Sequence, residues 1–303
     1  MERQFLNLTL LICLILSSCQ QLPEKKEVVP STNIQDQLQT TKIDNDKLTS
    51  YYSDIWDYIF MQSSYSSNEL DEQTLLYMNQ HLKDVDKFKE YLNDSYYFLF
   101  FVIQEIEKAN LPIELAFLPY IESNYDPFSI SSSGAVGIWQ FMPRTGRLYE
   151  LEKSWWNEDR HDPFRSTEAA VKYLKYLYQR FDNDLYLTLA AYNAGPSYLE
   201  RQIKKNQRRG LQSDFWSLDL PAQTRNYVPK FIALKELILN ASQYEIQLPY
   251  IPYEPVVAKI EIPGQVEVLT LSDYLNIKPE LLYKLNAGYT KWASAPSDKS
   301  IFY

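Results

Sequence analysis

The carboxylate at position 122 has the surroundings that acid–base chemistry requires. Glu122 ends an apolar stretch in which Leu115, Leu118 and Ile121 are spaced to share one face of a helix. An acid at the rim of such a helix is costly unless it is paired or kept neutral. Burial raises the pKa of a carboxyl group, and a general acid that works near neutral pH needs a raised pKa. Helix position alone also suits an ordinary exposed acid, so the motifs that follow Glu122 decide between the two interpretations.

Glu122 opens a series of short motifs that are rich in glycine, amides and aromatic residues. They are ESNYDP at residues 122–127, SSSGAVGIWQFMP at residues 131–143, AAYNAG at residues 190–195 and TRNYVP at residues 224–229. Gly134, Gly137 and Gly195 more readily serve backbone geometry than chemistry. Asp126 is the second carboxylate of the series, but an Asp just before a Pro usually caps a turn.

The elements that must position these motifs are helices. Apolar spacing predicts helices over residues 94–110, from 112 onwards, 185–194 and 224–239, with a loop at 129–137. We expect Ser166 to cap a further helix that runs to about Arg180. Short connections and the lack of a βαβ rhythm predict a mainly α protein, with its helical domain at residues 48–246.

The composition changes after residue 247. Four prolines separate short pieces that are rich in β-branched residues, such as residues 256–260, and two helical stretches follow at 271–275 and 279–285. We predict a small α+β appendage over residues 247–303. It could bind a ligand or pack on the helical domain, and we favour packing.

The N-terminus has the pattern of an export signal. Arg3 precedes an apolar run at residues 8–16, too short to span a bilayer, and Leu16-Ser17-Ser18-Cys19 resembles a bacterial lipobox. The resemblance implies cleavage after residue 18 and a lipid on Cys19. Residues 19–47 are polar and without periodicity, so we expect a flexible tether.

Composition excludes several other classes of function. The net charge is -9 and basic residues are not clustered, which argues against nucleic-acid binding. The two cysteines, Cys13 and Cys19, leave no thiol for a disulfide in a processed chain. His81 and His161 lie far apart in sequence and no Cys cluster accompanies them, so we expect no metal site.

The ordered motifs together resemble the lytic transglycosylases of the soluble-lytic-transglycosylase type, enzymes that cleave the glycan strands of peptidoglycan. The likeness has its core at residues 111–230 and includes LPIELA at 111–116 and DPFRSTEAA at 162–170. Toward the end, LNAG at 285–288 and WA at 292–293 are similar to the segment that follows the catalytic domain in that family; glycan-binding LysM repeats often come next there, and here the appendage is only LysM-like. The resemblance implies a lysozyme-like, goose-type helical catalytic domain.

Roles follow from this resemblance position by position. Glu122 matches the family's catalytic acid and base, and Tyr227 is placed to hydrogen-bond its carboxyl. Gln140 and Asn193 are amides that can bind sugar hydroxyl and N-acetyl groups. The other positions that match groove-lining residues are Ser131, Met142 and Tyr192. Trp139 could stack on a sugar ring or belong to the core, and the residues leave both interpretations open.

A single acid implies an unusual reaction. Most glycosidases use two carboxylates, whereas the family's chemistry takes its nucleophile from the substrate. Glu122 would protonate the oxygen between N-acetylmuramic acid and N-acetylglucosamine, and the muramic C6 hydroxyl would close onto C1 to form a 1,6-anhydro end. No cofactor is needed.

Two alternatives stay open at this stage. One is a hydrolytic muramidase of lysozyme-like fold, which would need a well-placed Asp, and the other is a catalytically inactive lipoprotein that binds peptidoglycan. For the enzyme we expect a monomer that acts on glycan strands in cell-wall remodelling. We expect Cys19 to anchor it to the periplasmic face of the outer membrane.

Overall fold

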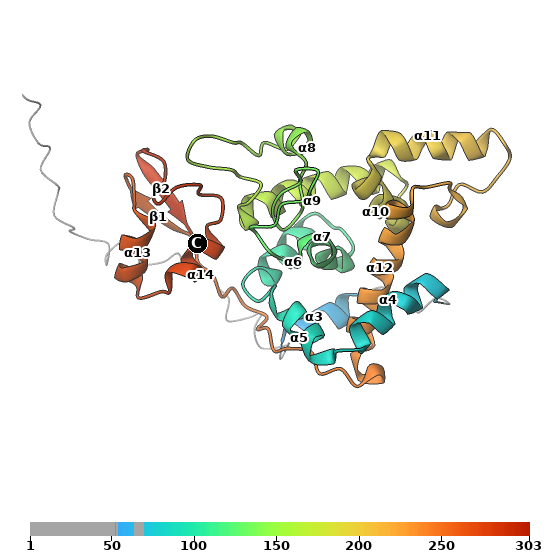
Figure 1. Cartoon of the computed structure of the whole chain (residues 1–303), viewed down its shortest axis with the longest axis horizontal. Coiled ribbons are helices and arrows are strands. Elements are labelled where there is room, and N and C mark those ends of the chain that lie inside the picture. The colour runs from blue at the N-terminus through green and yellow to red at the C-terminus, as the bar shows by residue number, and fades with distance from the viewer. Residues whose placement is uncertain (1–51, 53, 64–69) are drawn as a thin grey trace, which may run out of the picture. The chain divides into compact units, whose positions relative to one another are not determined.

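A computed structural model describes residue 52, residues 54–63 and residues 70–303 (Figure 1). These residues all fall in one compact unit, Asp44–Tyr303. The predicted signal peptide, Cys19 and the predicted tether lie outside the described residues. Within the described part of the chain, no helix is long and apolar enough to cross a membrane.

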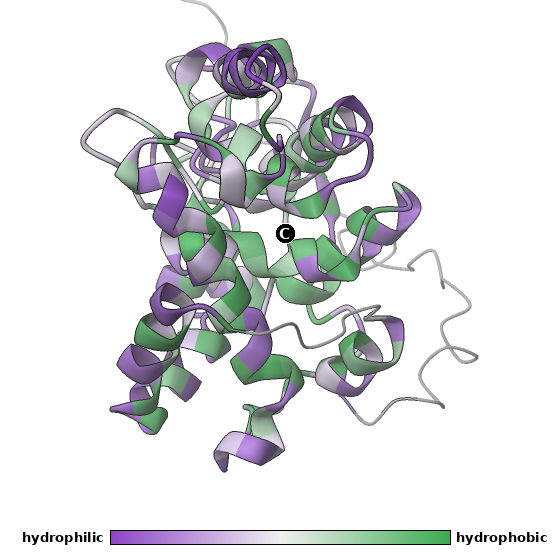
Figure 2. Cartoon of the chain, turned by 90° about the vertical axis from the view of Figure 1, so that its right-hand side faces the viewer, coloured by the Kyte–Doolittle hydropathy of each residue, from purple (hydrophilic) through white to green (hydrophobic). Residues whose placement is uncertain are grey.

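The fold is mainly α, as predicted. The helices before residue 245 are α3 (Ile55–Gln62), α4 (Glu72–Leu82), α5 (Val85–Asn93), α6 (Leu99–Lys108), η2 (Ile113–Phe117), α7 (Leu118–Ser123), α8 (Pro143–Leu148), α9 (Pro163–Arg180), α10 (Leu185–Ala194), α11 (Pro196–Gln207), η3 (Phe215–Ser217), α12 (Ala222–Leu239) and η4 (Ala241–Tyr244). Along these helices hydrophilic and hydrophobic stretches alternate (Figure 2), as expected when each helix presents one side to the core.

Aspartate side chains start many of these helices. Asp54, Asp71, Asp84 and Asp184 each accept hydrogen bonds from backbone N–H groups in the first turn that follows. The expected cap at Ser166 is wrong. Asp162 caps α9 instead, with Pro163 in the first turn, because Asp accepts from two N–H groups here and Pro suits the start of a helix.

The core of the helical part surrounds the segment that leads to Glu122. Leu115, Phe117 and Leu118 are fully buried, and α12 packs against both α4 and α10. The predicted helix at 94–110 is shorter than expected, because α5 ends at Asn93 and a turn separates it from α6. The helices predicted at 185–194 and 224–239 correspond to α10 and α12.

The C-terminal part is α+β, as predicted. Strand β1 (Ile260–Pro263) pairs antiparallel with β2 (Lys299–Phe302), and helices α13 (Val268–Leu275) and α14 (Pro279–Leu285) lie between them in the chain. Val268, Leu271, Leu282 and Phe302 form a separate small core. The predicted strand at 256–260 is wrong in position: β1 begins at Ile260, where the side chains alternate between half-buried and exposed.

Several contacts join the C-terminal part to the helical part, among them a ring contact of its final residue and two backbone hydrogen bonds. Tyr303 stacks on Phe164 of α9 with ring centroids 3.8 Å apart. The N–H of Glu158 donates to the carbonyl of Gly288 over 2.8 Å, and the N–H of Thr290 donates to the carbonyl of Trp156 over 2.8 Å. The loop between α8 and α9 reaches toward the C-terminal part to make these bonds (Figure 1).

Candidate active site

Glu122 lies near the end of α7, a helix of six residues that is anchored by its first half. Leu118, Pro119 and Tyr120 are buried, so the helix can turn very little about its axis. Asn124 follows in the left-handed region with φ 59° and ends the helix. The result is a fixed carboxyl at the rim of the core, as the sequence predicted.

Tyr227 of α12 donates a hydrogen bond from its hydroxyl to Oε1 of Glu122, which confirms the predicted contact. Burial raises the pKa of the Glu122 carboxyl to about 7, although the hydrogen bond from Tyr227 opposes the rise. A carboxyl with such a pKa is protonated in a large fraction of molecules at neutral pH, and it can also accept a proton back.

Tyr192 of α10 is a second tyrosine near enough to Glu122 to be affected by its charge. Its hydroxyl donates to the carbonyl of Trp139 over 2.8 Å. Burial, and then the charge of Glu122, raise the pKa of Tyr192 well above its ordinary value, so it stays neutral. Next to it in the chain, Asn193 accepts at Oδ1 from the hydroxyl of Thr224 over 2.9 Å. A hydrogen bond therefore joins directly two motifs whose bonded residues are 31 positions apart in sequence.

The loop at residues 129–141 folds back on itself. Val136 forms isolated antiparallel bridges with Ile130 and with Phe141. The hydroxyl of Ser131 accepts from the N–H of Ala135 over 2.9 Å and so closes the turn. Ser131 thus has a structural use inside the loop, and its groove-lining role stays a prediction.

Gln140 stands in the left-handed region, with φ 49°. Its Nε2 donates to the carbonyls of Gly137, over 2.9 Å, and Ser129, over 3.3 Å. The amide hydrogens are thereby used to hold the loop, and Oε1 is the side-chain atom that a ligand could engage.

Only glycine fits at position 137 of this loop. Its φ is 79°, and a Cβ atom there would lie 1.9 Å from the carbonyl oxygen of Arg160. Any side chain would push apart the loop and the segment that contains Arg160. The neighbouring Ile138 carbonyl accepts a hydrogen bond from the hydroxyl of Ser123 over 3.0 Å. The loop is therefore tied to the residue that follows Glu122.

Arg160 binds the middle and the C-terminal end of this loop, and sequence reasoning missed it. Its Nη1 donates to the carbonyls of Gly134, over 3.1 Å, and Phe141, over 2.9 Å. Glu158 binds the same guanidinium through both carboxylate oxygens, at 2.8 and 3.1 Å. The buried charge is thus paired, as a buried Arg requires. The signal in the sequence was the dense charged run at 158–162, which has no amphipathic pattern.

Two residues that the sequence left ambiguous have structural roles. Trp139 is 0% exposed and donates from Nε1 to the hydroxyl of Thr167 over 2.8 Å, so it belongs to the core. Asp126 is exposed and accepts from the N–H of Phe128 over 2.9 Å, as a turn-capping Asp does.

Met142, which the sequence predicted to line the groove, is 42% exposed at the start of α8. Within the described residues, no hydrogen bond or ring contact joins it to Glu122.

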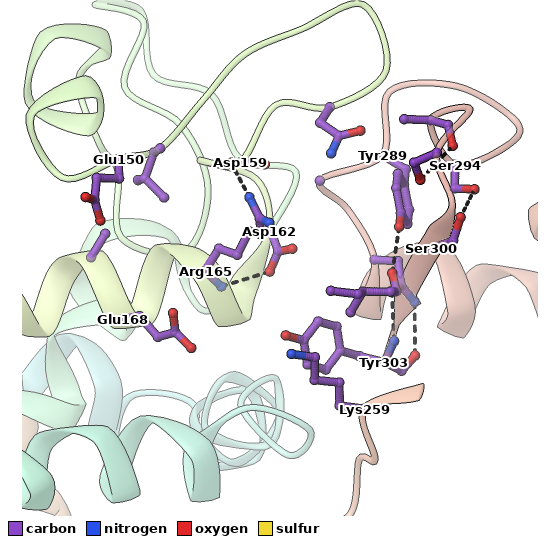
Figure 3. A pocket seen from close by; sticks show the side chains of 18 of the residues that line it. Glu150, Asp159, Asp162, Arg165, Glu168, Lys259, Tyr289, Ser294, Ser300 and Tyr303 are labelled. Carbon is purple, nitrogen blue, oxygen red and sulfur yellow. Dashed lines mark hydrogen bonds and ion pairs between the residues drawn. The ribbon is translucent and has the colours of Figure 1, made fainter. Parts of the chain in front are cut away.

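A separate cavity of about 340 Å³ lies between α9 and the C-terminal part (Figure 3). Its lining mixes acids and bases, including the Asp159–Arg165 ion pair at 2.7 Å. Burial raises the pKa of Asp162 in this wall to about 6. None of the predicted site residues lines this cavity. Among the described residues no cluster of His, Cys, Asp and Glu has the arrangement of a metal site.

Comparison with known proteins identifies one segment of the chain directly. Residues 101–215 match the family "Transglycosylase SLT domain", and this range contains Glu122, Gln140 and Asn193 but ends before Tyr227.

Among curated relatives, membrane-bound lytic murein transglycosylase D of Escherichia coli K12 is 37% identical over 215 residues, which are 69% of this chain and 48% of the relative. The soluble lytic murein transglycosylase of the same strain is 29% identical over 117 residues, which are 37% of this chain and 18% of that protein. The chain thus spans about half the length of the first of these relatives.

A solved structure, the 70 kDa soluble lytic transglycosylase from Escherichia coli, matches with a TM-score of 0.41 and 23% identity, over 60% of this chain and 32% of that one. The family model and the curated relatives agree with each other and with the motifs around Glu122. Over residues 101–215 the chain matches the transglycosylase SLT domain family, in agreement with its similarity to lytic murein transglycosylases.

Proposed function

We propose that the chain is a peptidoglycan lytic transglycosylase that cleaves the β-1,4 bond between N-acetylmuramic acid and N-acetylglucosamine. The observation that carries the proposal is the Glu122 carboxyl, which is desolvated, bonded by Tyr227 and has a pKa of about 7. The family match and the names of the relatives support the same activity.

Glu122 acts twice in this proposal. Its proton moves to the glycosidic oxygen as the bond from that oxygen to C1 of the muramic acid breaks. The oxocarbenium-like centre is then attacked by the C6 hydroxyl oxygen of the same sugar, and the hydroxyl proton returns to Glu122. All protons and bonds are thus accounted for without a water molecule, and the product has a 1,6-anhydro end. Attack from within the substrate has an entropic advantage over attack by a free molecule.

The neighbouring groups serve this cycle by orientation. Tyr227 holds Oε1 of Glu122, which leaves Oε2 for the substrate oxygen. Tyr192, held on the carbonyl of Trp139, fixes the wall beside the acid. We assign substrate binding to Nδ2 of Asn193 and Oε1 of Gln140, because the opposite atom of each amide is already bonded within the protein.

The products test this proposal. Purified sacculi digested with the protein should release muropeptides with 1,6-anhydro ends, lighter by one water than lysozyme products and resistant to borohydride. In heavy-oxygen water the anomeric carbon should stay unlabelled, as mass spectrometry would show. Reducible, labelled ends as the main product would mean a hydrolase and would refute the lyase chemistry.

The proposal also includes an export signal at residues 1–18, a tether at 19–47, a catalytic domain at 48–246 and an appendage at 247–303. A lipid on Cys19 would anchor the enzyme to the outer membrane, and the lipobox-like sequence and the "membrane-bound" relative support this. Fractionation of cells that express the native and Cys19→Ala forms is the test. Equal partition of both forms into the soluble fraction would refute the anchor.

A further inference from the structure

The six tryptophans of the chain differ widely in exposure. Trp56 and Trp139 are 1% and 0% exposed and belong to the core. Trp155 and Trp292 are 72% and 61% exposed, although they lie 137 positions apart in sequence. Leaving a large aromatic side chain in water forgoes a stabilising burial of roughly 2–3 kcal/mol. Exposed aromatic side chains that gather at one place mark a binding surface.

Trp155 and Trp292 both lie where the loop after α8 contacts the C-terminal part, next to the half-buried Trp156. Trp156 and Trp292 have ring centroids 6.2 Å apart at an interplanar angle of 63°. Nζ of Lys291 lies 3.8 Å from the ring centroid of Trp155. We call this surface, formed by Trp155, Trp156 and Trp292 with Lys291, the Trp platform.

The backbone beneath the Trp platform is fixed. Thr290 donates from its N–H to the carbonyl of Trp156 and from its hydroxyl to the carbonyl of Trp155, both over 2.8 Å. The hydroxyl of Ser154 accepts from the N–H of Trp156 over 3.1 Å, and the carbonyl of Trp292 accepts from the start of α13 over 2.8 Å. A rigid aromatic surface loses little entropy when it binds a ligand.

We propose that the Trp platform binds pyranose rings of a peptidoglycan glycan strand, at residues distinct from those around Glu122. This inference rests on the proposed function for the identity of the glycan. The C–H groups on one face of a pyranose form a flat apolar surface with partial positive charge, which suits the negative face of an indole. Muramic acid and its stem peptides bear carboxylates, and the ammonium group of Lys291 complements them.

The composition of the two segments favours a sugar over a membrane or an apolar protein surface. Residues 152–157 and 288–293 contain Glu, Lys, Ser, Asn and Thr beside the aromatic residues, and no Leu, Ile, Val, Phe or Met. A surface that inserts into lipid needs such aliphatic side chains next to its tryptophans. A sugar, in contrast, presents one apolar face and a rim of hydroxyl groups that polar side chains can bind.

A second contact with the same strand would raise the effective concentration of glycan at Glu122. The test uses protein with Glu122→Gln, so that the strand is held without being cut, and measures its co-sedimentation with purified sacculi. Trp155→Ala combined with Trp292→Ala should weaken binding by roughly tenfold or more, as loss of aromatic anchors does. Trp155→Tyr, which keeps a ring, should retain most of the affinity.

Trp216→Ala is the matched control, because Trp216 is 51% exposed but packs on Tyr186 and Phe215 instead. It should leave binding within about twofold. Melting temperatures of all variants establish that they fold. Equal binding by the double variant and its parent would overturn the proposal, as would an equal loss in Trp216→Ala.

Further measurements distinguish binding of glycan from binding of stem peptides or lipid. They also distinguish failure of the Trp platform from failure of the proposed function. Sacculi stripped of stem peptides by an amidase should still be bound through the Trp platform. Binding to phosphatidylethanolamine–phosphatidylglycerol vesicles that depends on the same tryptophans, without such dependence on sacculi, would overturn the glycan assignment. If native protein releases no muropeptides but binds sacculi in a Trp-dependent way, the proposed function fails and the Trp platform stands.

Discussion

Glu122 and Asp162 are two carboxyl groups whose pKa values are raised by the same cause and whose surroundings differ. Burial raises them to about 7 and about 6, respectively. Asp162 accepts from the backbone N–H groups of Phe164 and Arg165 at the start of α9, over 2.9 and 3.0 Å. Glu122 is held by one phenol, from Tyr227, and one of its oxygens stays available. A raised pKa alone therefore does not distinguish the two carboxyls; their bonding partners do, and they favour Glu122 for the proposed catalytic role.

The largest difference between the two carboxyls should appear in activity. Glu122→Gln keeps the shape of the side chain but cannot transfer a proton, and we expect a loss of about 100- to 10,000-fold. Turbidity clearing of sacculi measures the activity, and Asp162→Asn is the matched control with a similar change of chemistry. Comparable losses in both variants would show that the comparison is wrong.

The partner of Glu122 should set its working pH. Tyr227→Phe removes the hydrogen bond that lowers the pKa of Glu122, so that pKa should rise further. The acid then stays protonated to higher pH, and the alkaline limb of the activity profile should move upward. We also expect activity to fall by roughly tenfold, because one charge-assisted hydrogen bond is lost. A profile that keeps its position would exclude this role for Tyr227.

The burial of Glu122 should make the unfolding free energy of the protein fall as the pH rises from acidic to neutral. Because its folded pKa of about 7 exceeds the ordinary 4.5, the folded state binds the proton more tightly. The stabilisation that this proton gives the folded state is fully present below the pKa of Glu122 in the unfolded state. It is lost as the pH rises through the pKa of Glu122 in the folded state. Relative to Glu122→Gln, the native protein should therefore lose roughly 1–3 kcal/mol of unfolding free energy between acidic and neutral pH. Urea unfolding at several pH values measures this difference, and parallel curves would contradict it.

The smallest effect belongs to the capping role of Asp162. Asp162→Ala removes the acceptor for two N–H groups at the start of α9 and should lower the unfolding free energy by about 1 kcal/mol. Asn is also a good cap, so Asp162→Asn should lower the unfolding free energy by only a few tenths of that amount. Thermal unfolding distinguishes the two variants. Equal destabilisation by Ala and Asn would mean that the charge of Asp162, and not its capping bonds, matters.

The sequence predicted those features that depend on local pattern or on several ordered motifs. The helices α10 and α14 follow from apolar spacing and bounding residues, and the Tyr227–Glu122 contact was expected from the resemblance to a known family. The start of α9 was misplaced because Asp162 and Ser166 are both good caps, and only the chain path decides between them.

Other features could not be predicted because they depend on contacts between distant segments. Arg160 has its role only because the carbonyls of Gly134 and Phe141 approach it, and a single Arg gives no periodic signal. Strand β2 has four residues, which is too short for an alternating pattern to stand out. The Trp platform joins residues from the loop after α8 with residues after α14, and its aromatic side chains do not repeat at a fixed spacing.

Direct titration of the two carboxyls tests the central claim most closely. Carbon-13 NMR of side-chain carboxyl groups, in native protein and in the Glu122→Gln and Asp162→Asn variants, assigns each titration by its disappearance. We predict a carboxyl with a midpoint near 7 that is absent only in Glu122→Gln, and another near 6 that is absent only in Asp162→Asn. A Glu122 carboxyl that titrates near its ordinary 4.5 would contradict the account, because the acid would then be ionised at neutral pH and unable to protonate the leaving oxygen.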